Sequence, residues 1–281
     1  MQELLEYLKG ADAEREMERW LAARHLSDPL GDSYFALNPW TMRLRPPDSE
    51  GQSIAAEARP LAVVLAVPDP PWTTVVDTSA DEIWGWLQTM GGQGYPPFTN
   101  FPAFFPGGYR PRAMAGGLIV EEDCRGTNHQ IDSYFAVDGA GVVQLGLTHR
   151  AYGFPVREPS RVCFKLTPLV CYVRQFLGVV AALYARFGQS RPFSLIVNLR
   201  GTAGAGLGAF AENLAVQQPV ACWTPHLQLR YPAQMAVSDF DAVVRHVAID
   251  LCNAWGQRHP LCYLQGNPAN GLDVRVFNDC Y

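Results

Sequence analysis

The sequence predicts an α+β protein with a mixed β-sheet flanked by helices and an acidic helical arm in front of it. Short apolar runs of strand length, such as 61–67 (LAVVLAV), lie between proline-rich turns. They alternate with amphipathic stretches that have helical spacing and capping residues. The chain has 281 residues, 48% of them hydrophobic, so it can bury a large core and is neither intrinsically disordered nor a coiled coil.

Residues 1–60 are predicted to form an acidic helical arm and a connecting region, and residues 61–281 an α+β body. Met17, Trp20 and Leu21 form a narrow apolar stripe on the arm, among charged residues. Such a stripe needs a surface to pack on. We expect it to dock on the body of the same chain or, alternatively, on a partner.

The predicted strands of the body follow from apolar content, alternation and the turns that bound them. The run 61–67 is apolar at every position, which is typical of a strand buried on both faces. The segment Asp138-Gly139-Ala140-Gly141 predicts a turn that joins two strands into a hairpin. In chain order, strands are expected at 61–67, 118–122, 131–137, 142–147, 161–166, 193–199 and 226–231.

Three helices are expected in the body. Ser79 and Glu82 form a capping-box pattern at the start of a short helix. Residues 169–187 are apolar on nearly every side, so this helix is expected in the core. The helix expected at 239–255 has one apolar stripe, and Gly256 follows it as the stop signal.

The net charge of −5 hides a division along the chain. Residues 1–123 carry 18 acids and 9 bases, whereas residues 124–281 carry 9 acids and 13 bases. Basic clusters of this kind contact phosphates, and the alternative is a set of solvated arginines that pair with the acidic part. The candidate nucleic-acid-binding residues, expected on one face, are Arg157, Arg161, Arg191 and Arg200. Arg174 and Arg186 are expected to project from the ends of the core helix.

An aromatic and proline-rich segment, 94–112, is the most unusual part of the sequence. Its rings either pack over the core as a loop or form a surface that stacks on a base or grips a partner. The candidate partner- or ligand-binding residues are Tyr95, Phe98, Phe101, Phe104, Phe105, Tyr109, Arg110 and Arg112.

The glycine-rich stretch 201–209 follows a predicted strand and is expected to precede a short helical run. Gly204, Gly206 and Ala209 satisfy a dinucleotide-binding pattern literally, but Pro219 cuts the helix short and no acidic residue follows at the required distance. We therefore favour a flexible strand-to-helix connection over a nucleotide site.

Cysteine and histidine residues offer two weaker hypotheses. Cys124 and His129 lie close enough in sequence for a nucleophile pair or a metal-assisted hydrolase. Cys222, His226, His259 and Cys262 could supply zinc ligands, but their spacing matches no common zinc finger. No catalytic residue, metal or cofactor is predicted.

Targeting signals are not apparent. Residues 1–10 lack the pattern of a signal peptide, and the apolar run 176–185 is too short to cross a bilayer. Seven cysteines without framework spacing favour reduced thiols. The sequence thus predicts a soluble, cytoplasmic protein that does not contact a membrane.

Several segments resemble the C-terminal half of bacterial Schlafen/AlbA-type DNA-binding or ATP-binding proteins. The matching parts are Gly116-Gly117-Leu118-Ile119-Val120, Asp132-Ser133-Tyr134-Phe135, Gly141-Val142-Val143, strand 193–199 with its glycine turn, and Phe240 through Ala254-Trp255-Gly256. The likeness covers roughly 107–270. In that family the nuclease or nucleotide chemistry belongs to an N-terminal module with spaced glutamates and a lysine, a pattern that residues 1–106 lack. The resemblance implies an accessory half without the catalytic half.

The function expected from these observations is that of a non-catalytic binding or accessory subunit. It would work with a protein partner that handles nucleic acid, and the resemblance implies a setting in bacterial defence against phage. Two alternatives stay open: a cysteine- or metal-assisted hydrolase around Cys124 and His129, and a small-ligand sensor that uses the glycine turn and the aromatic segment.

Overall fold

The structure is a computed structural model of the chain. It describes residues 61–68, 76–90, 110–114, 116–121, 133–148, 153–155, 162–187, 192–202, 205–208, 226–233 and 240–257. The α+β class is confirmed, because helices and an antiparallel sheet make up most of these residues. The predicted arm, 1–60, lies outside the described part.

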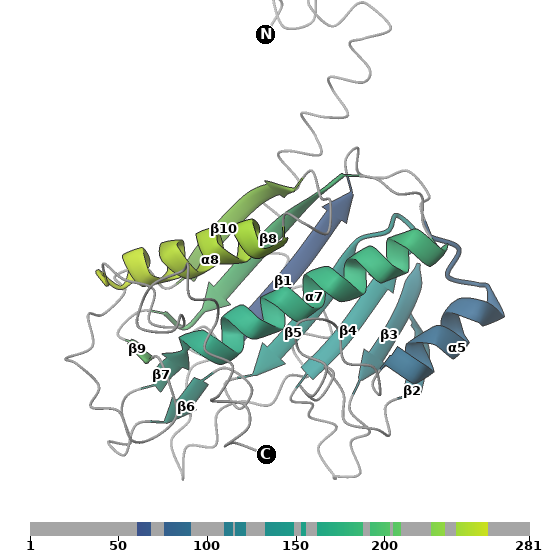
Figure 1. Cartoon of the computed structure of the whole chain (residues 1–281). Helices are drawn as coiled ribbons and strands as arrows, with labels where there is room; N and C mark the ends of the chain where they lie inside the picture. Colours follow the sequence, from purple (N-terminus) through teal and green to yellow (C-terminus); the bar gives the residue numbers. More distant parts are fainter. Residues whose placement is uncertain are drawn as a thin grey trace, which may run out of the picture.

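A seven-stranded sheet forms the centre of the fold (Figure 1). Its strands are β1 (Leu61–Pro68), β2 (Arg110–Met114), β3 (Gly117–Glu121), β4 (Ser133–Asp138), β5 (Val143–Thr148), β8 (Phe193–Arg200) and β10 (His226–Ala233). Their order is β10-β8-β1-β5-β4-β3-β2, and every neighbouring pair is antiparallel. β1 lies between β8 and β5, and its residues 62–67 are at most 3% exposed. This position confirms the prediction that 61–67 is a strand buried on both faces.

The strand β2 was not expected from the sequence. Pro111 lies within it and lacks a backbone N–H, which is tolerated because β2 is the outermost strand at its end of the sheet. Because β2 lies at the edge of the sheet, it can contain a proline and still be a strand.

A second, three-stranded sheet is mixed. It consists of β6 (Gly153–Pro155), β7 (Val162–Lys165) and β9 (Gly206–Gly208). β6 pairs with β7 antiparallel, and β9 pairs with β7 parallel.

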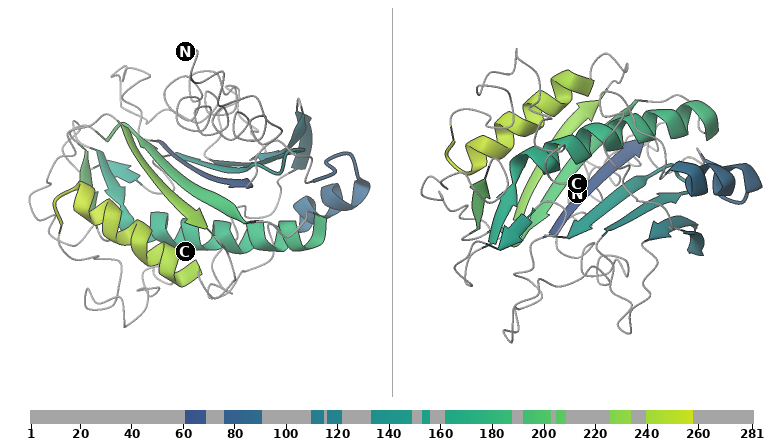
Figure 2. Two further views of the ribbon diagram at one scale, coloured as in Figure 1. Left: turned by 90° about the horizontal axis from the view of Figure 1, so that it is seen from above. Right: turned by 60° about the horizontal axis from the view of Figure 1, so that its bottom comes forward.

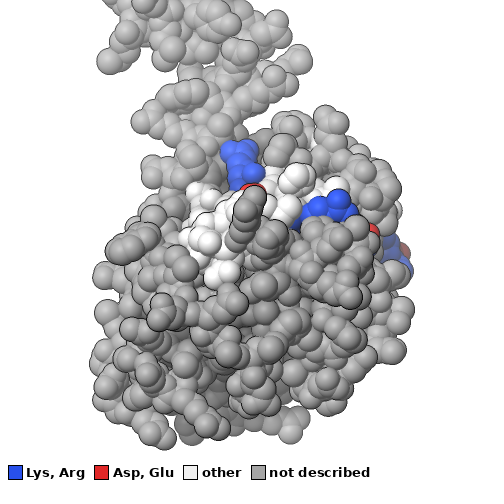
Figure 3. Space-filling view, turned by 60° about the vertical axis from the view of Figure 1, so that its left-hand side comes forward, with Lys and Arg blue, Asp and Glu red and all other residues white. Residues whose placement is uncertain are grey.

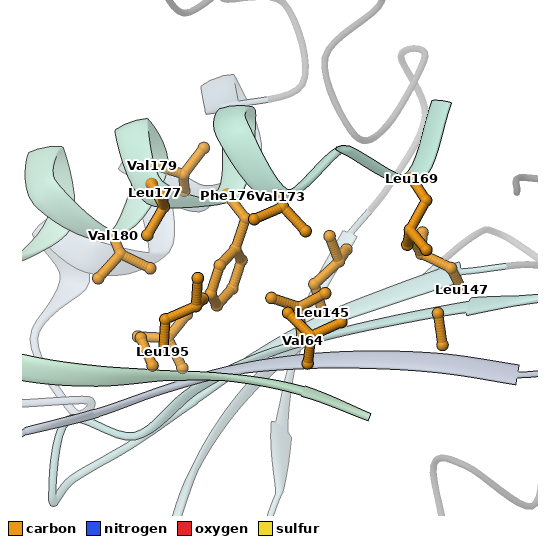
Figure 4. Close-up of a cluster of buried hydrophobic side chains, with 14 of the residues drawn as sticks. Val64, Leu145, Leu147, Leu169, Val173, Phe176, Leu177, Val179, Val180 and Leu195 are labelled. Carbon is orange, nitrogen blue, oxygen red and sulfur yellow. The ribbon is translucent and has the colours of Figure 1, made fainter. Parts of the chain in front are cut away.

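Three described helices lie on one side of the large sheet: α5 (Asp81–Met90), α7 (Leu166–Phe187) and α8 (Phe240–Ala254) (Figures 1 and 2). α7 crosses the sheet and directs Val173, Phe176 and Val180 at the apolar side chains of the strands (Figure 4). It begins three residues earlier than expected. Pro168 is then its third residue, where the backbone N–H would have no partner within the helix.

α7 is also long and apolar enough to pass for a membrane span, with a mean hydropathy of 1.6, and it is the one such helix among the described residues. Yet 72% of that stretch is buried inside the protein. Burial of this extent is typical of the core helix of a soluble protein and confirms the expected core position.

The two predicted helix boundaries had different outcomes. Gly256 adopts a φ of 68°, and the N–H of Gln257 donates to the carbonyl of Cys252 at 2.8 Å, so the stop signal after α8 is confirmed. The capping box at Ser79 is wrong by one residue. Asp77 accepts hydrogen bonds from the backbone N–H and the Oγ of Ser79, and α5 begins only at Asp81.

Gly146 should not tolerate a side chain. It lies directly across the β4–β5 ladder from Tyr134, and a Cβ at this position would overlap the fully buried Tyr134 ring. Because overpacking a core is destabilising, we expect Gly146→Ala to lower the free energy of unfolding by about 2 kcal/mol in urea denaturation.

Gly85 provides the matched control. It is exposed in the middle of α5, and a Cβ there would meet no atom within 4 Å. Gly85→Ala should raise the free energy of unfolding by roughly 0.5–1 kcal/mol. Equal stability of Gly146→Ala and the wild type would contradict the close packing of Tyr134.

Candidate functional site

The two faces of the seven-stranded sheet differ in what they carry. Side chains of one face pack beneath α7 and α8 in the main core. The opposite face, called the second face here, holds a separate apolar cluster of Val63, Leu65, Val67 and Ile196. No described helix lies on that side (Figure 2).

Around this cluster the second face is polar and basic. Strand register places Gln144 opposite Leu65 and Asn198 opposite Val63. On β10, Gln228 pairs with Asn198, and Arg230 pairs with Ile196. The four adjacent strands β10, β8, β1 and β5 contain no Asp or Glu at any position.

Exposure on the second face falls from the outer strand toward the centre. On β10, Gln228 and Arg230 are exposed, and Arg200 at the end of β8 is half-buried. Nearer the centre, Asn198 is 4% exposed and Gln144 is 8% exposed. On the side of the molecule that carries β10 and α8, the described surface is mostly uncharged, with a few basic side chains spaced apart and small acidic areas beside them (Figure 3).

Asn198 has an unsatisfied amide. Its Nδ2 atom is buried and has no hydrogen-bond partner. Leaving a buried donor without a partner costs about 1–3 kcal/mol, so this amide is available to an acceptor that reaches it.

The predicted nucleic-acid-binding arginines are placed only in part. Arg157, Arg161 and Arg191 lie outside the described residues. Arg200 ends β8, and the structure brings it to the same face as Arg230, which the sequence analysis did not single out. Alternation along β10 was the available signal, because Arg230 and its neighbour Tyr231 must point to opposite faces.

The predicted aromatic surface falls largely outside the described residues, which include none of its rings. Arg110 and Arg112 belong to β2, and Arg112 is exposed and pairs with Ile119. The role assigned to Tyr95, Phe98, Phe101, Phe104, Phe105 and Tyr109 stays a prediction.

The expectation that Arg174 projects from a helix end is wrong. Its side chain is 9% exposed in the interior of α7, and its Nε lies 2.7 Å from Asp241 Oδ1 on α8. The guanidinium also lies 5.3 Å from the centre of the Phe240 ring. These contacts hold α7 and α8 together, and they pair the positive charge of Arg174 within the fold. Arg186, by contrast, is exposed near the end of α7, as expected.

Part of the glycine-rich stretch forms a strand, and the helical run expected after it lies outside the described residues. Gly206–Gly208 form β9, and the carbonyl of Ala205 accepts a 2.8 Å hydrogen bond from Nε1 of Trp255. The expectation of a flexible connection is therefore wrong for 206–208, which form a strand. A dinucleotide site would need a helix N-terminus after the glycines, and the residues that would form it lie outside the described part.

The cysteine and histidine hypotheses concern residues outside the described part: Cys124, His129, Cys222, His259 and Cys262, as well as the side chain of His226. Within the described ranges, no three His, Cys, Asp or Glu residues gather as metal ligands. Cys171 and Cys252 are buried and form no disulfide.

The remaining perturbed groups join elements of the fold. Burial raises the pKa of the Tyr184 hydroxyl, which donates to the carbonyl of Gly141 at 2.6 Å. Burial and a hydrogen bond to Asp250 raise the pKa of Tyr231. The Tyr231 hydroxyl on β10 donates to Oδ2 of Asp250 on α8 at 2.7 Å, which links the strand to the helix. Both tyrosines stay neutral donors and have structural roles.

Comparison with known proteins adds no relative: no family model, curated protein or solved structure matches the chain. The resemblance to Schlafen/AlbA-type proteins therefore stays a prediction.

The ion pair between α7 and α8 predicts an asymmetric response to mutation. Asp241 is 74% exposed, so losing its own charge costs little, but Asp241→Ala leaves the nearly buried Arg174 without its carboxylate. Hydrogen bonds to charged groups contribute about 1.5–3 kcal/mol, and solvent screening places the expected loss at the low end. Urea denaturation should show it, whereas Arg245→Ala on the exposed side of α8 should change stability by less than about 0.5 kcal/mol. Equal effects of the two variants would refute a structural role for the pair.

Asp138 should make stability depend on pH in a defined direction. Burial raises the pKa of its carboxyl above the ordinary 3.8, although the N–H of Val142 donates to it at 2.9 Å. Its contribution to stability is therefore fully present below the unfolded pKa and is lost as pH rises through the folded pKa.

Asp138→Asn keeps an acceptor for the Val142 N–H without the charge. We expect this variant to be at least as stable as the wild type at pH 7, and the advantage to vanish near pH ~3. Asp138→Ala, which has no acceptor, should be less stable at both values. Weakened folding of Asp138→Asn at pH 7 would show instead that the charge supports the hairpin.

Proposed function

We propose that the chain is a non-catalytic binding subunit that contacts a polyanion, namely the nucleic acid handled by a protein partner, through the β10 side of the second face. The observation that supports this function is the charge of that face. Four adjacent strands carry Arg200 and Arg230 and no acidic residue, and the outermost strand exposes Arg230.

The chemistry of these side chains suits phosphate. A guanidinium donates two parallel hydrogen bonds to phosphate oxygens, and the neighbouring amide of Gln228 adds a neutral donor. Gln228 and Arg230 are two residues apart on one strand, so they emerge on the same face roughly 7 Å apart. Contacts of this kind position a backbone and carry no sequence information.

The same charges limit what the chain does alone. Two phosphate contacts give a small salt-dependent affinity, and the 18 acids of residues 1–123 repel a polyanion. A protein partner must supply the remaining contacts, which is the sense in which the subunit is accessory. A cytoplasmic location is part of this proposal, and a setting in bacterial anti-phage defence rests on the resemblance alone.

Filter binding of a single-stranded oligonucleotide at several salt concentrations tests the proposal. Two contacts predict a slope of log affinity against log salt of about −1.5. Arg230→Ala should reduce that slope by about 0.7, and the Arg200→Ala, Arg230→Ala double variant should abolish binding.

Arg245→Ala is the matched control, because Arg245 is also exposed but lies on α8, which covers the opposite face. Its slope should equal that of the wild type. Failure of the full chain to bind at low salt, or an unchanged slope in Arg230→Ala, would exclude this surface.

A further inference from the structure

We infer that residues 1–60 dock on the second face of the sheet, where Met17, Trp20 and Leu21 cover the apolar cluster of Val63, Leu65, Val67 and Ile196. This intramolecular surface lies at the centre of the face and borders Arg200 and Arg230 of the proposed polyanion contact.

The four side chains of the cluster are shielded from water. Val63, Leu65 and Ile196 are 0% exposed and Val67 is 3% exposed, although they point away from the face that packs on α7 and α8. Apolar side chains on a sheet face are shielded from water only when another layer packs on them. No described helix provides that layer.

The burial of the cluster does not depend on another molecule. These side chains are buried within a single chain, so neither a partner nor a second copy is needed to explain their burial.

Residues 1–60 fit the role of the covering layer in length and position. They lead directly into β1, the strand that carries three of the four cluster residues. Residues 63–67 span about 14 Å along the strand. Fourteen residues of the arm in the helical conformation that the stripe of Met17, Trp20 and Leu21 predicts would be about 20 Å long, enough to cover the cluster. The 34 residues of 27–60 are long enough to let it return over the sheet.

Amphipathic pattern and charge agree with this assignment. The stripe of Met17, Trp20 and Leu21 is narrow, as is the cluster, and charged residues surround it. Residues 1–60 carry 11 acids and 7 bases, whereas the surrounding strands of the second face offer Arg200 and Arg230 without any acid. The acidic segment thus complements the basic border of its docking site.

A double-mutant cycle in the full chain tests the inference. Ile196 and Val197 are neighbours on β8, both fully buried, and they point to opposite faces. Trp20→Ala is combined with Ile196→Ala in one cycle and with Val197→Ala in the other, and the folding equilibrium constant is measured by urea denaturation.

Trp20→Ala alone should lower the folding constant by at least about tenfold, because a large ring leaves an apolar contact. In combination with Ile196→Ala, the loss should be smaller than the product of the two single losses by about fivefold or more. With Val197→Ala the losses should multiply. If the alanine variants do not fold, milder substitutions supply the same comparison. Trp20→Phe is then combined with Ile196→Val in one cycle and with Val197→Thr in the other.

Any of three results in the mutant cycles would overturn the inference, and so would a concentration dependence of the coupling. The three results are an unchanged folding constant in Trp20→Ala, multiplicative losses with Ile196, and equal coupling to Ile196 and Val197. Coupling that strengthens with protein concentration would assign the cover to a second copy and would also overturn it. Because stability is measured without nucleic acid, none of these results depends on whether the proposed function holds.

Discussion

α7 packs along one face of the seven-stranded sheet, and this burial constrains every other described element. Fourteen of its residues are buried, including the polar Gln175 and Thr167, so water is excluded on nearly all sides. Contacts from α7 then position its neighbours. Arg174 binds Asp241 at the start of α8, Phe187 packs edge-on against Trp86 of α5, and Tyr184 bonds to the hairpin turn. Because dispersion and hydrophobic terms add over so many contacts, the helical layer behaves as one body with the sheet.

Because the described helices lie on one face of the sheet, polar groups on the two faces have different surroundings. On the helical side, the Arg174 guanidinium and the Tyr231 hydroxyl bond within the fold, whereas the Gln175 amide on α7 is buried without a partner. The second face keeps a buried amide without a partner on Asn198, next to an apolar cluster, and an exposed arginine on the outer strand. A covering segment at its centre and a polyanion at its outer strand are compatible uses of one face, since exposure rises steadily from β1 to β10.

Sequence patterns predicted correctly those elements whose structure depends on residues that are neighbours in the sequence. The continuous apolar run of β1, the β4–β5 hairpin and the glycine after α8 are correct because each depends on neighbouring residues. β2 contains Pro111, and only its edge position makes it a strand; β9 forms because β7 lies beside it. Arg174 finds a carboxylate 67 residues away, and Arg200 acquires Arg230 as a neighbour only through the pairing of β8 with β10. Such tertiary partners leave no local signal in the sequence.

Arginine footprinting by mass spectrometry can show whether the β10 side of the second face contacts a polyanion. A dicarbonyl reagent modifies accessible guanidinium groups, and its rate at each arginine is compared with and without a bound oligonucleotide. We expect slower modification of Arg230 and Arg200 in the presence of the oligonucleotide, with unchanged rates at Arg245 and Arg186. Protection of Arg245 or Arg186 in their place would contradict it, because these residues lie on helices of the other face.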